Sequence, residues 1–244
     1  MTPEQLVILS AAVLVVAFLY SSVGHAGASG YIAIMSLVGL APAVIKPTAL
    51  ALNIFVACIT TWQFWRAGYF SWALFWPFAL LSVPLAFVGG YTALPTGTFK
   101  VLVGIVLLFS AARLLMRPQP DVKKSDPPRM AALAIGAGIG LLSGLTGTGG
   151  GIFLTPIVLF KQWATARAAA AISALFILVN SVAGLLGNLS ATRDFPTPAL
   201  FLMAAAGVGG AAGSYLGSSR ISPMVIKRLL AIVLLIAGAK LIFT

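Results

Sequence analysis

Charged side chains are missing from long stretches of this chain, and this limits the possible folds more than any other feature. Only 8% of the 244 residues are charged and 60% are hydrophobic, whereas a soluble domain carries about 25% charged residues. So few charges cannot cover a water-facing surface. Because one membrane span takes about 20 apolar residues, roughly eight to ten spans would use nearly the whole chain. The sequence predicts an all-α, polytopic membrane protein of 8–10 transmembrane segments.

Apolar segments separated by glycine, proline and polar residues predict ten helices in two groups of five. The first group lies at residues 6–22, 29–40, 46–65, 72–90 and 99–116. The second group lies at residues 130–145, 150–160, 167–188, 198–217 and 225–243. A charged, proline-rich stretch at 117–129 separates them, and such a stretch is typical of a linker. We therefore expect a first membrane repeat at 1–116, a cytoplasmic linker at 117–129 and a second repeat at 130–244.

The two groups match each other at an offset of 121 residues. Ser22 then matches Ser143, and Gly30 matches Gly151. An odd number of spans in each half would give the two halves opposite orientations, as in inverted repeats. With the linker in the cytoplasm, four of the 15 Lys and Arg residues face outside and the other eleven face inside. The positive-inside rule favours this orientation, with both termini outside. The four outside residues are Lys46, Lys100, Arg193 and Lys240.

Two segments are short, and each begins in a glycine-rich break. Residues 22–30 (SVGHAGASG) open one of them and residues 143–151 (SGLTGTGGG) open the other. Ten or so apolar residues are too few to cross a bilayer and suit a broken or re-entrant helix. The glycines either let helices pack closely, or leave helix N–H groups free near the midplane to bind an anion. Nucleotide binding is excluded, because neither break has the Lys of a P-loop or the strand and acid of a dinucleotide fold.

The polar residues of the breaks and of the neighbouring long segments predict an anion site. His25 is the one titratable side chain inside the predicted membrane region, and it either bonds to a neighbouring carbonyl or hydroxyl or binds the substrate. Asn53 and Asn180 either link helices through hydrogen bonds or line a polar pathway. Lys46 and Arg167 either anchor their helices at the interface or hold an anion at each mouth. The predicted substrate-binding residues are Ser22, His25, Ser29, Gly30, Asn53, Thr146, Thr148, Gly149, Gly150, Gly151 and Asn180.

Several activities are excluded because no apolar segment contains a carboxylate. The four acidic residues all lie outside the predicted spans, so paired-carboxylate catalysis and carboxylate metal sites are not expected inside the membrane. One Cys and one His cannot form a zinc site by themselves. We therefore expect no catalytic residues, no metal and no cofactor. The net charge of +11 indicates cytoplasmic loops and not nucleic-acid binding, which leaves membrane lipid and a small anion as the expected partners.

Residues 143–156 (SGLTGTGGGIFLTP) resemble the hallmark of the TauE/SafE sulfite exporter family, also called TSUP transporters. Residues 66–72 (RAGYFSW), and residues 213–217 followed by Pro223, are similar to two further motifs of that family. Where its members usually carry three glycines in the first break, this chain has Ala28, Ser29 and Gly30. The resemblance implies a secondary transporter, expected to be an exporter, that moves sulfite, a sulfonate or a related organic anion across the cytoplasmic membrane. The alternative is a membrane structural or assembly subunit without transport activity; a membrane enzyme would need clustered His, Asp or Glu residues.

Overall fold

The computed structural model describes residues 3–21, 25–115, 125–194, 197–217 and 223–243. Within these residues all regular secondary structure is helical, which confirms the predicted all-α membrane class. The first half contains α1 (Pro3–Ser21), α2 (Ala28–Leu37), α3 (Pro42–Arg66), α4 (Trp72–Tyr91) and α5 (Thr96–Leu115). The second half contains α6 (Arg129–Thr146), α7 (Gly151–Phe160), α8 (Ala166–Thr192), α9 (Thr197–Gly217) and α10 (Pro223–Phe243).

Helix lengths divide the ten helices into eight long and two short ones. α1, α3, α4, α6 and α8 contain stretches long and apolar enough to cross a membrane. α5, α9 and α10 have 20, 21 and 21 residues, about 30 Å at the usual helical rise, which is the thickness of the hydrocarbon core. α2 and α7 have ten residues each, about 15 Å, and so reach halfway across. The two short glycine-led helices are present as predicted.

The two central long helices extend beyond the apolar runs that predict them. α3 begins at Pro42, four residues before the predicted start, because proline suits the first turn of a helix. α8 begins at Ala166, where Thr165 Oγ1 accepts a hydrogen bond from the Ala168 N–H at 3.4 Å. It continues to Thr192, four residues past the predicted end. The added turn of α8 contains Ser190 and Thr192, polar residues that continue the hydrogen-bonded helix beyond its apolar part. The added turn of α3, residues 42–45, is apolar and begins with proline.

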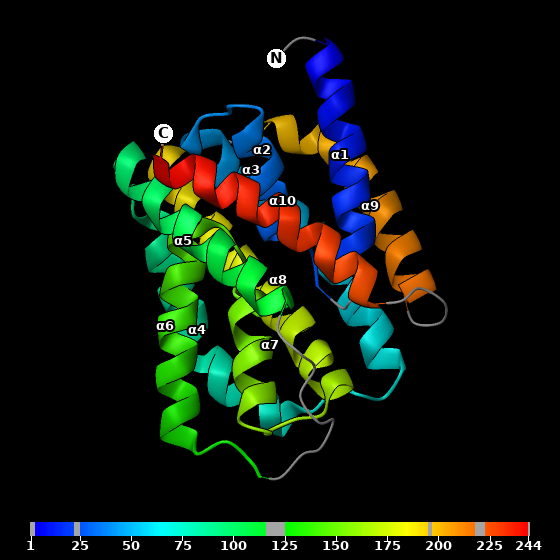
Figure 1. Ribbon diagram of the computed structural model, residues 1–244. Coiled ribbons are helices and arrows are strands. Elements are labelled where there is room, and N and C mark those ends of the chain that lie inside the picture. The colour runs from blue at the N-terminus through cyan, green and yellow to red at the C-terminus, as the bar shows by residue number, and fades with distance from the viewer. Residues whose placement is uncertain (1–2, 22–24, 116–124, 195–196, 218–222, 244) are drawn as a thin grey trace.

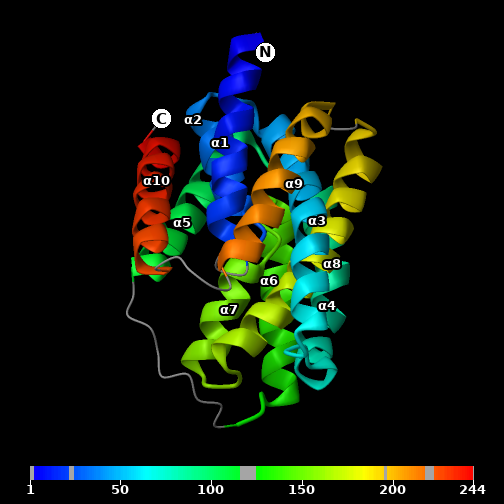
Figure 2. The same ribbon diagram turned by 90° about the vertical axis from the view of Figure 1, so that its right-hand side faces the viewer.

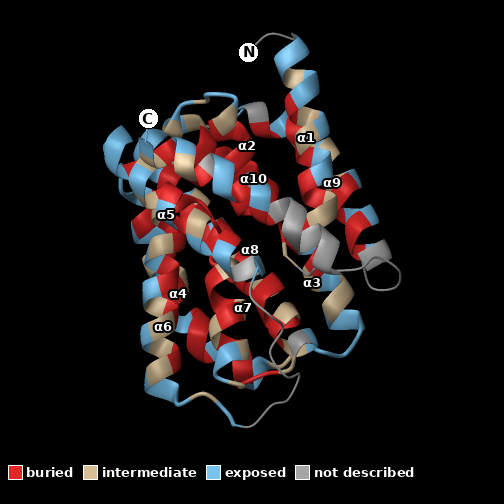
Figure 3. Cartoon of the chain, viewed as in Figure 1, coloured by how far each residue is buried: buried red, intermediate tan, exposed pale blue. Residues whose placement is uncertain are grey.

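α3 and α8 form the centre of the molecule. They pack against each other, and each also contacts the short helix of its own half, α2 on α3 and α7 on α8. Among the five candidate spans they are the most deeply buried, each with 67% of the residues in the apolar stretch inside the protein. Figure 3 shows this gradient, with buried residues gathered in the interior and exposed ones on the outer faces of the helices.

The pairing of helices is similar for the two halves. α4 packs on α6 and α8 of the second half, and α9 packs on α1 and α3 of the first half. α5 pairs with α10, and Figure 2 shows these two helices together at one side of the bundle. Exchanging α1–α5 for α6–α10 converts the two contacts of α4 into the two contacts of α9 and leaves α5 paired with α10. A duplicated chain would pack in this way, while the inverted relation of the halves stays a prediction.

The two chain ends lie at one end of the molecule, and the start of α6 lies at the other (Figures 1 and 2). The second half of the chain therefore runs from one end of the bundle to the opposite end. The predicted topology needs this arrangement, because it places the termini and the linker on opposite sides. Residues 117–124 of the predicted linker lie outside the described residues. Which end faces the cytoplasm stays a prediction.

A row of glycines brings α6 into contact with the backbone of α4. Gly136, Gly140 and Gly144 are spaced by four residues and share one face of α6. A Cβ at any of them would overlap a backbone carbonyl oxygen of α4. These oxygens belong to Phe78, Ser82 and Ala86. These three glycines therefore allow close packing of α6 against α4, as small residues often do between membrane helices.

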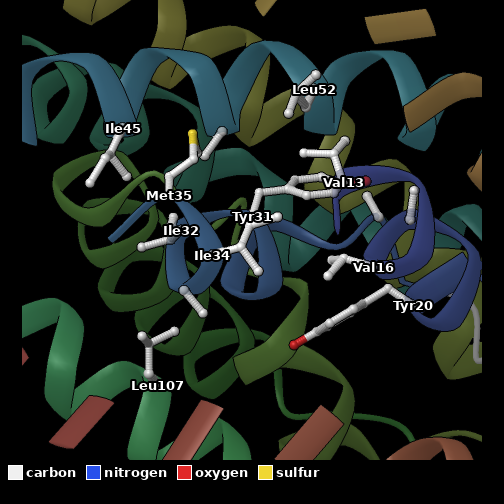
Figure 4. Close-up of a cluster of buried hydrophobic side chains, with 14 of the residues drawn as sticks. Val13, Val16, Tyr20, Tyr31, Ile32, Ile34, Met35, Ile45, Leu52 and Leu107 are labelled. Carbon is white, nitrogen blue, oxygen red and sulfur yellow. The ribbon is translucent and has the colours of Figure 1, made fainter. Parts of the chain in front are cut away.

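The short helix α2 lies inside the protein and not on its surface. Nine of its ten residues, all but Leu37, are buried, as expected for a helix that is apolar on every face. Figure 4 shows Ile32 and Met35 of α2 between Ile45 of α3 and Leu107 of α5. This packing holds α2 in the interior, and residues 26–30, the last part of the first glycine-rich break, are buried with it.

Candidate functional site

The second glycine-rich break has a backbone conformation that favours glycine. α6 ends at Thr146 and α7 begins at Gly151. Between them Gly147, Gly149 and Gly150 have φ angles of 83°, 73° and 82°. This left-handed conformation costs a residue with a Cβ about 1–2 kcal/mol. The backbone conformation therefore favours glycine at these three positions, in addition to any need for close helix packing. The first N–H groups of α7 that follow have no partner within their own helix.

Gly149 lies against two polar side chains of the central helices. A Cβ on Gly149 would be 2.6 Å from Asn53 Nδ2 and 2.9 Å from Ser181 Oγ. Asn53 Nδ2 donates a hydrogen bond to Ser181 Oγ at 3.4 Å, which is long for an N–H···O bond. Both side chains are fully buried, and Asn53 Oδ1 has no hydrogen-bond partner. Because buried polar atoms are rarely left unpaired, this oxygen marks a place for a ligand or a water molecule.

The contact of Asn53 with Ser181 lies near the middle of the membrane region. Asn53 is the twelfth of 25 residues in α3, and Ser181 is the sixteenth of 27 in α8. Transporters built from two repeats commonly bind their substrates at this depth, beside broken helices. Within the part of the chain that the structure describes, no three His, Cys, Asp or Glu side chains gather. The groups around Gly149 are therefore neutral amide, hydroxyl and backbone groups.

His25 connects the first break to the second half. Its Nε2 lies 3.2 Å from Thr155 Oγ1 of α7, and this hydroxyl lies 2.7 Å from Ser173 Oγ of α8. The imidazole is half-buried. This contact fits the first of the two alternatives for His25, a bond to a neighbouring hydroxyl. A role of His25 in substrate binding stays a prediction. Ser22, the other predicted polar residue of this break, lies outside the described residues.

The two breaks contact the same face of α8 at different depths. Ser173, Ile177 and Ser181 are four residues apart and so face the same way. The first break reaches Ser173 through Thr155, and the second reaches Ser181 through Gly149. Eight helical residues separate these contacts by about 12 Å along the axis. Ile177 lies between them and would contact a Cβ on Gly149 or on Gly151.

Other predicted residues of the first break face α1. Ser29 Oγ and Tyr20 OH lie 2.7 Å apart and form a buried hydrogen bond. A Cβ on Gly30 would overlap Val16, and it would lie 2.8 Å from the Tyr20 ring. These contacts fix the start of α2 against α1. Their part in substrate binding stays a prediction.

The remaining predicted residues of the second break are held by their own neighbours. Thr146 Oγ1 donates to the Leu142 carbonyl at 2.7 Å and lies 3.0 Å from Thr148 Oγ1. Gly150 faces apolar groups, since its Cβ would lie 2.9 Å from Phe176 and from Ile139. Gly149 is therefore the residue of this break that lies against polar side chains of both central helices.

Asn180 differs from Asn53 although both lie on the central helices. Its Oδ1 accepts from Ser82 Oγ of α4 at 2.7 Å, and its Nδ2 donates to the Phe176 carbonyl at 2.8 Å. Both ends of the amide thus have partners, and the side chain links α8 to α4. This geometry fits the interhelical interpretation of Asn180, whereas Asn53 keeps a free acceptor.

Lys46 caps the C-terminal end of α4. Its Nζ donates to the carbonyl oxygens of Gly89, Gly90 and Thr92 at 3.0, 2.9 and 3.1 Å. A cation is favourable there, because the last carbonyls of a helix carry partial negative charge. Lys46 thus caps α4 from inside the protein, a role that neither sequence interpretation included.

Arg167, which matches Lys46 in the repeat, has different surroundings. It is exposed, its Nη1 donates to Tyr69 OH at 2.6 Å, and its guanidinium lies 5.2 Å from the centre of that ring. This contact near the aromatic residues between α3 and α4 is typical of an interfacial anchor.

Two hydroxyl residues that the sequence does not single out belong to this region. They are Thr155 and Ser173. Serine and threonine in apolar helices usually bond to their own backbone, so their presence alone carries no signal. Ser181 is one of the polar residues of its segment that either link helices or line a polar pathway, and Ser173 lies two turns before it on the same face, a spacing that could have identified Ser173.

Comparisons with known proteins agree with this architecture. Residues 9–241 match the family model described as sulfite exporter TauE/SafE. The chain is 42% identical over 240 residues to the probable membrane transporter protein y4hK of Sinorhizobium fredii (strain NBRC 101917 / NGR234), covering 96% of this chain and 97% of that protein. No solved structure shows a significant match to the chain. The apolar helices, the paired glycine-led short helices and these two matches establish that the chain is a multi-pass membrane protein of the TauE/SafE sulfite exporter family, a family of membrane transporters.

Proposed function

We propose that this protein is a secondary transporter that moves a small oxyanion, such as sulfite or a sulfonate, across the cytoplasmic membrane. The observation that carries the proposal is the meeting of Asn53 and Ser181 at Gly149, near the middle of the two most buried helices. The family description, sulfite exporter, and the name of the relative, a probable membrane transporter, both favour it.

The chemistry of this place suits a partly protonated oxyanion. Ser181 and the first N–H groups of α7 can donate to anionic oxygens, and the positive end of the helix dipole favours negative charge there. Asn53 Oδ1 needs a donor, which the proton of hydrogen sulfite or the ammonium group of an aminosulfonate would supply. An anion leaves water for such a site only if protein donors replace its hydration. Backbone and hydroxyl donors can do this without a Lys or Arg at the midplane.

Alternating access would come from movement of the two halves around α3 and α8. Each half contributes one short helix and one central helix, so a rocking motion would open the space beside Gly149 to one side at a time. No carboxylate lies in the predicted spans. Proton coupling would therefore use His25 or a proton carried by the substrate itself.

Sulfite flux through proteoliposomes tests the proposal against the alternative of a structural or assembly subunit. The Ser181→Ala variant removes a donor at Gly149, and Ser110→Ala is its matched control. Ser110 is also fully buried, but it lies on α5 and donates to its own helix at Val106 O. We expect flux with the wild type and with Ser110→Ala, and a clear loss with Ser181→Ala. Absence of flux of sulfite, sulfonates and carboxylates with folded wild-type protein would favour the structural subunit.

A further inference from the structure

A cavity of about 150 Å³ is lined by residues from several helix ends. These helix ends lie at the end of the molecule that carries both chain ends (Figure 1). The cavity lies where α2 ends, α3 and α5 begin and α10 ends, and its wall includes Ile45 and Phe99. A cavity of this size can hold a ligand as large as benzene. Ile45 precedes Asn53 by eight residues on α3, so the cavity is about 12 Å along the axis from the midplane contact. It is therefore a separate place in the protein.

One wall of the cavity carries a hydroxyl group that lacks a partner. Ser36 lies in the last turn of α2 and is 7% exposed, and its Oγ makes no hydrogen bond. A buried hydroxyl without a partner is unfavourable, because it loses its hydration and gains nothing in return. Ser36 lines the cavity, although its Oγ is enclosed in the orientation observed. Rotation of this side chain would turn the hydroxyl toward a ligand oxygen in the cavity, which would accept its hydrogen bond.

Two lysines also line this cavity. Lys100 comes from the first turn of α5 and Lys240 from the last turn of α10. Lys240 Nζ also donates to the Leu37 carbonyl at 3.1 Å, which holds it at the end of α2. Among the described residues that line the cavity there is no carboxylate. The lining thus combines two cations with one hydroxyl donor.

Membrane orientation does not account for these lysines. The positive-inside rule explains cations on the linker side, whereas the side of the termini has only four in the predicted topology. Lys46 uses its charge to cap α4. Two of the remaining three, Lys100 and Lys240, meet at one cavity. The presence of both lysines in the lining of one cavity indicates a binding site for a negatively charged group.

We propose that this cavity binds one oxyanion group, held by the Lys100 and Lys240 ammonium groups and by the Ser36 hydroxyl. The shared chemistry is a tetrahedral or pyramidal group of anionic oxygens. It is supplied either by a free anion such as sulfate or by the headgroup phosphate of an anionic lipid. The site is independent of the proposed transport site, since it uses other residues on other helix ends.

Thermal unfolding of the full chain in detergent tests binding of the free anion. Sulfate replaces chloride at constant ionic strength, and the wild type should show a saturable rise in the unfolding midpoint. Lys100→Gln/Lys240→Gln should raise the half-saturating sulfate concentration at least tenfold, and Ser36→Ala should raise it severalfold. Arg193→Gln is the matched control, because it removes one charge on the same side but does not line the cavity. If the double variant does not fold, Lys100→Gln alone gives the same test, since Gln at 100 breaks no hydrogen bond of the fold.

Native mass spectrometry from bilayers that contain phosphatidylglycerol and phosphatidylcholine tests the lipid source. Retention of phosphatidylglycerol by the wild type and by Arg193→Gln, but not by Lys100→Gln/Lys240→Gln, would support the site with a lipid in it, even if sulfate has no effect. Equal sulfate stabilisation in the double variant and the control, or no effect of sulfate and no lipid retention, would overturn the proposal. In an Asn53→Leu background the sulfate effect should persist. Its loss there would place the anion at the midplane, which contradicts the cavity site and leaves the proposed function standing.

Discussion

Substitution of Gly149 by alanine tests whether this glycine is needed for substrate binding or only for the left-handed backbone conformation. In Gly149→Ala the new Cβ would approach Asn53 Nδ2, Ile177 Cγ2 and Ser181 Oγ at 2.6, 2.9 and 2.9 Å. Contacts this short force the neighbours to move, and the bond between Asn53 and Ser181 cannot keep its geometry. Transport of a small oxyanion should therefore fall sharply.

The matched control for this variant is Gly68→Ala. Gly68 has φ of 75°, close to the 73° of Gly149, but no atom lies within 4 Å of its Cβ position. Both variants carry the cost of left-handed backbone, about 1–2 kcal/mol. Gly149→Ala adds overpacking of about 1–3 kcal/mol and the loss of one hydrogen bond, about 1 kcal/mol. We expect the free energy of unfolding to fall by about 1–2 kcal/mol in the control and by about 3–6 kcal/mol in Gly149→Ala.

The assay is sulfite uptake by proteoliposomes with equal amounts of folded protein. A hydrogen bond to a charged ligand contributes about 1.5–3 kcal/mol, which corresponds to roughly a 10- to 100-fold loss of affinity. We expect this loss for Gly149→Ala and near wild-type affinity for Gly68→Ala. Equal affinities for the two folded variants would refute the assignment of Gly149 to the site. If Gly149→Ala does not fold, Ser181→Ala tests the same contact with less strain.

Three further predictions concern single residues: His25, Lys46 and Asp126. His25→Ala should weaken anion binding or remove its pH dependence between about pH 5 and 8, where imidazole titrates; an unchanged affinity and pH profile in proteoliposomes would make His25 a structural residue. Lys46→Met should lower the free energy of unfolding by about 1–3 kcal/mol, because three carbonyls of α4 lose their donor; normal stability with lost transport would instead place Lys46 in the pathway. A cysteine introduced at Asp126, after replacement of Cys58, should resist an impermeant thiol reagent added to intact cells, since the linker is predicted to be cytoplasmic; ready labelling would reverse the predicted orientation.

The positions of the helices could be predicted from the sequence because hydrophobicity and length are enough to define membrane helices. The short helices α2 and α7 were also predictable, since ten apolar residues after a glycine run cannot span a bilayer. The end of α8 was less accurate, because its last turn contains polar residues and has no apolar signal. The start of α3 was placed one turn late, because the proline at its first position does not by itself distinguish a helix start from a helix break.

The composition of the site could be predicted only in part. Asn53 and Asn180 look equivalent in the sequence, and only the three-dimensional packing shows that Ser82 of α4 bonds to Asn180 while Asn53 Oδ1 has no partner. The link from His25 through Thr155 depends on how the two halves pack together. Local patterns do not contain that information.

The capping role of Lys46 also depends on long-range packing. Its three carbonyl partners lie more than forty residues further along the chain. A matched residue such as Arg167 suggests equal roles for the two halves. The different surroundings of the two side chains show that a repeat in sequence does not require a repeat in contacts.

A structure of the full chain in a lipid nanodisc, determined with and without sulfite, tests whether the anion binds at the midplane. We expect sulfite-dependent density beside Gly149, within hydrogen-bond distance of Ser181 Oγ, close to Asn53 and at the N-terminal end of α7. Sulfite density elsewhere on the protein, with only protein atoms in contact with Asn53 and Ser181, would contradict the proposed site.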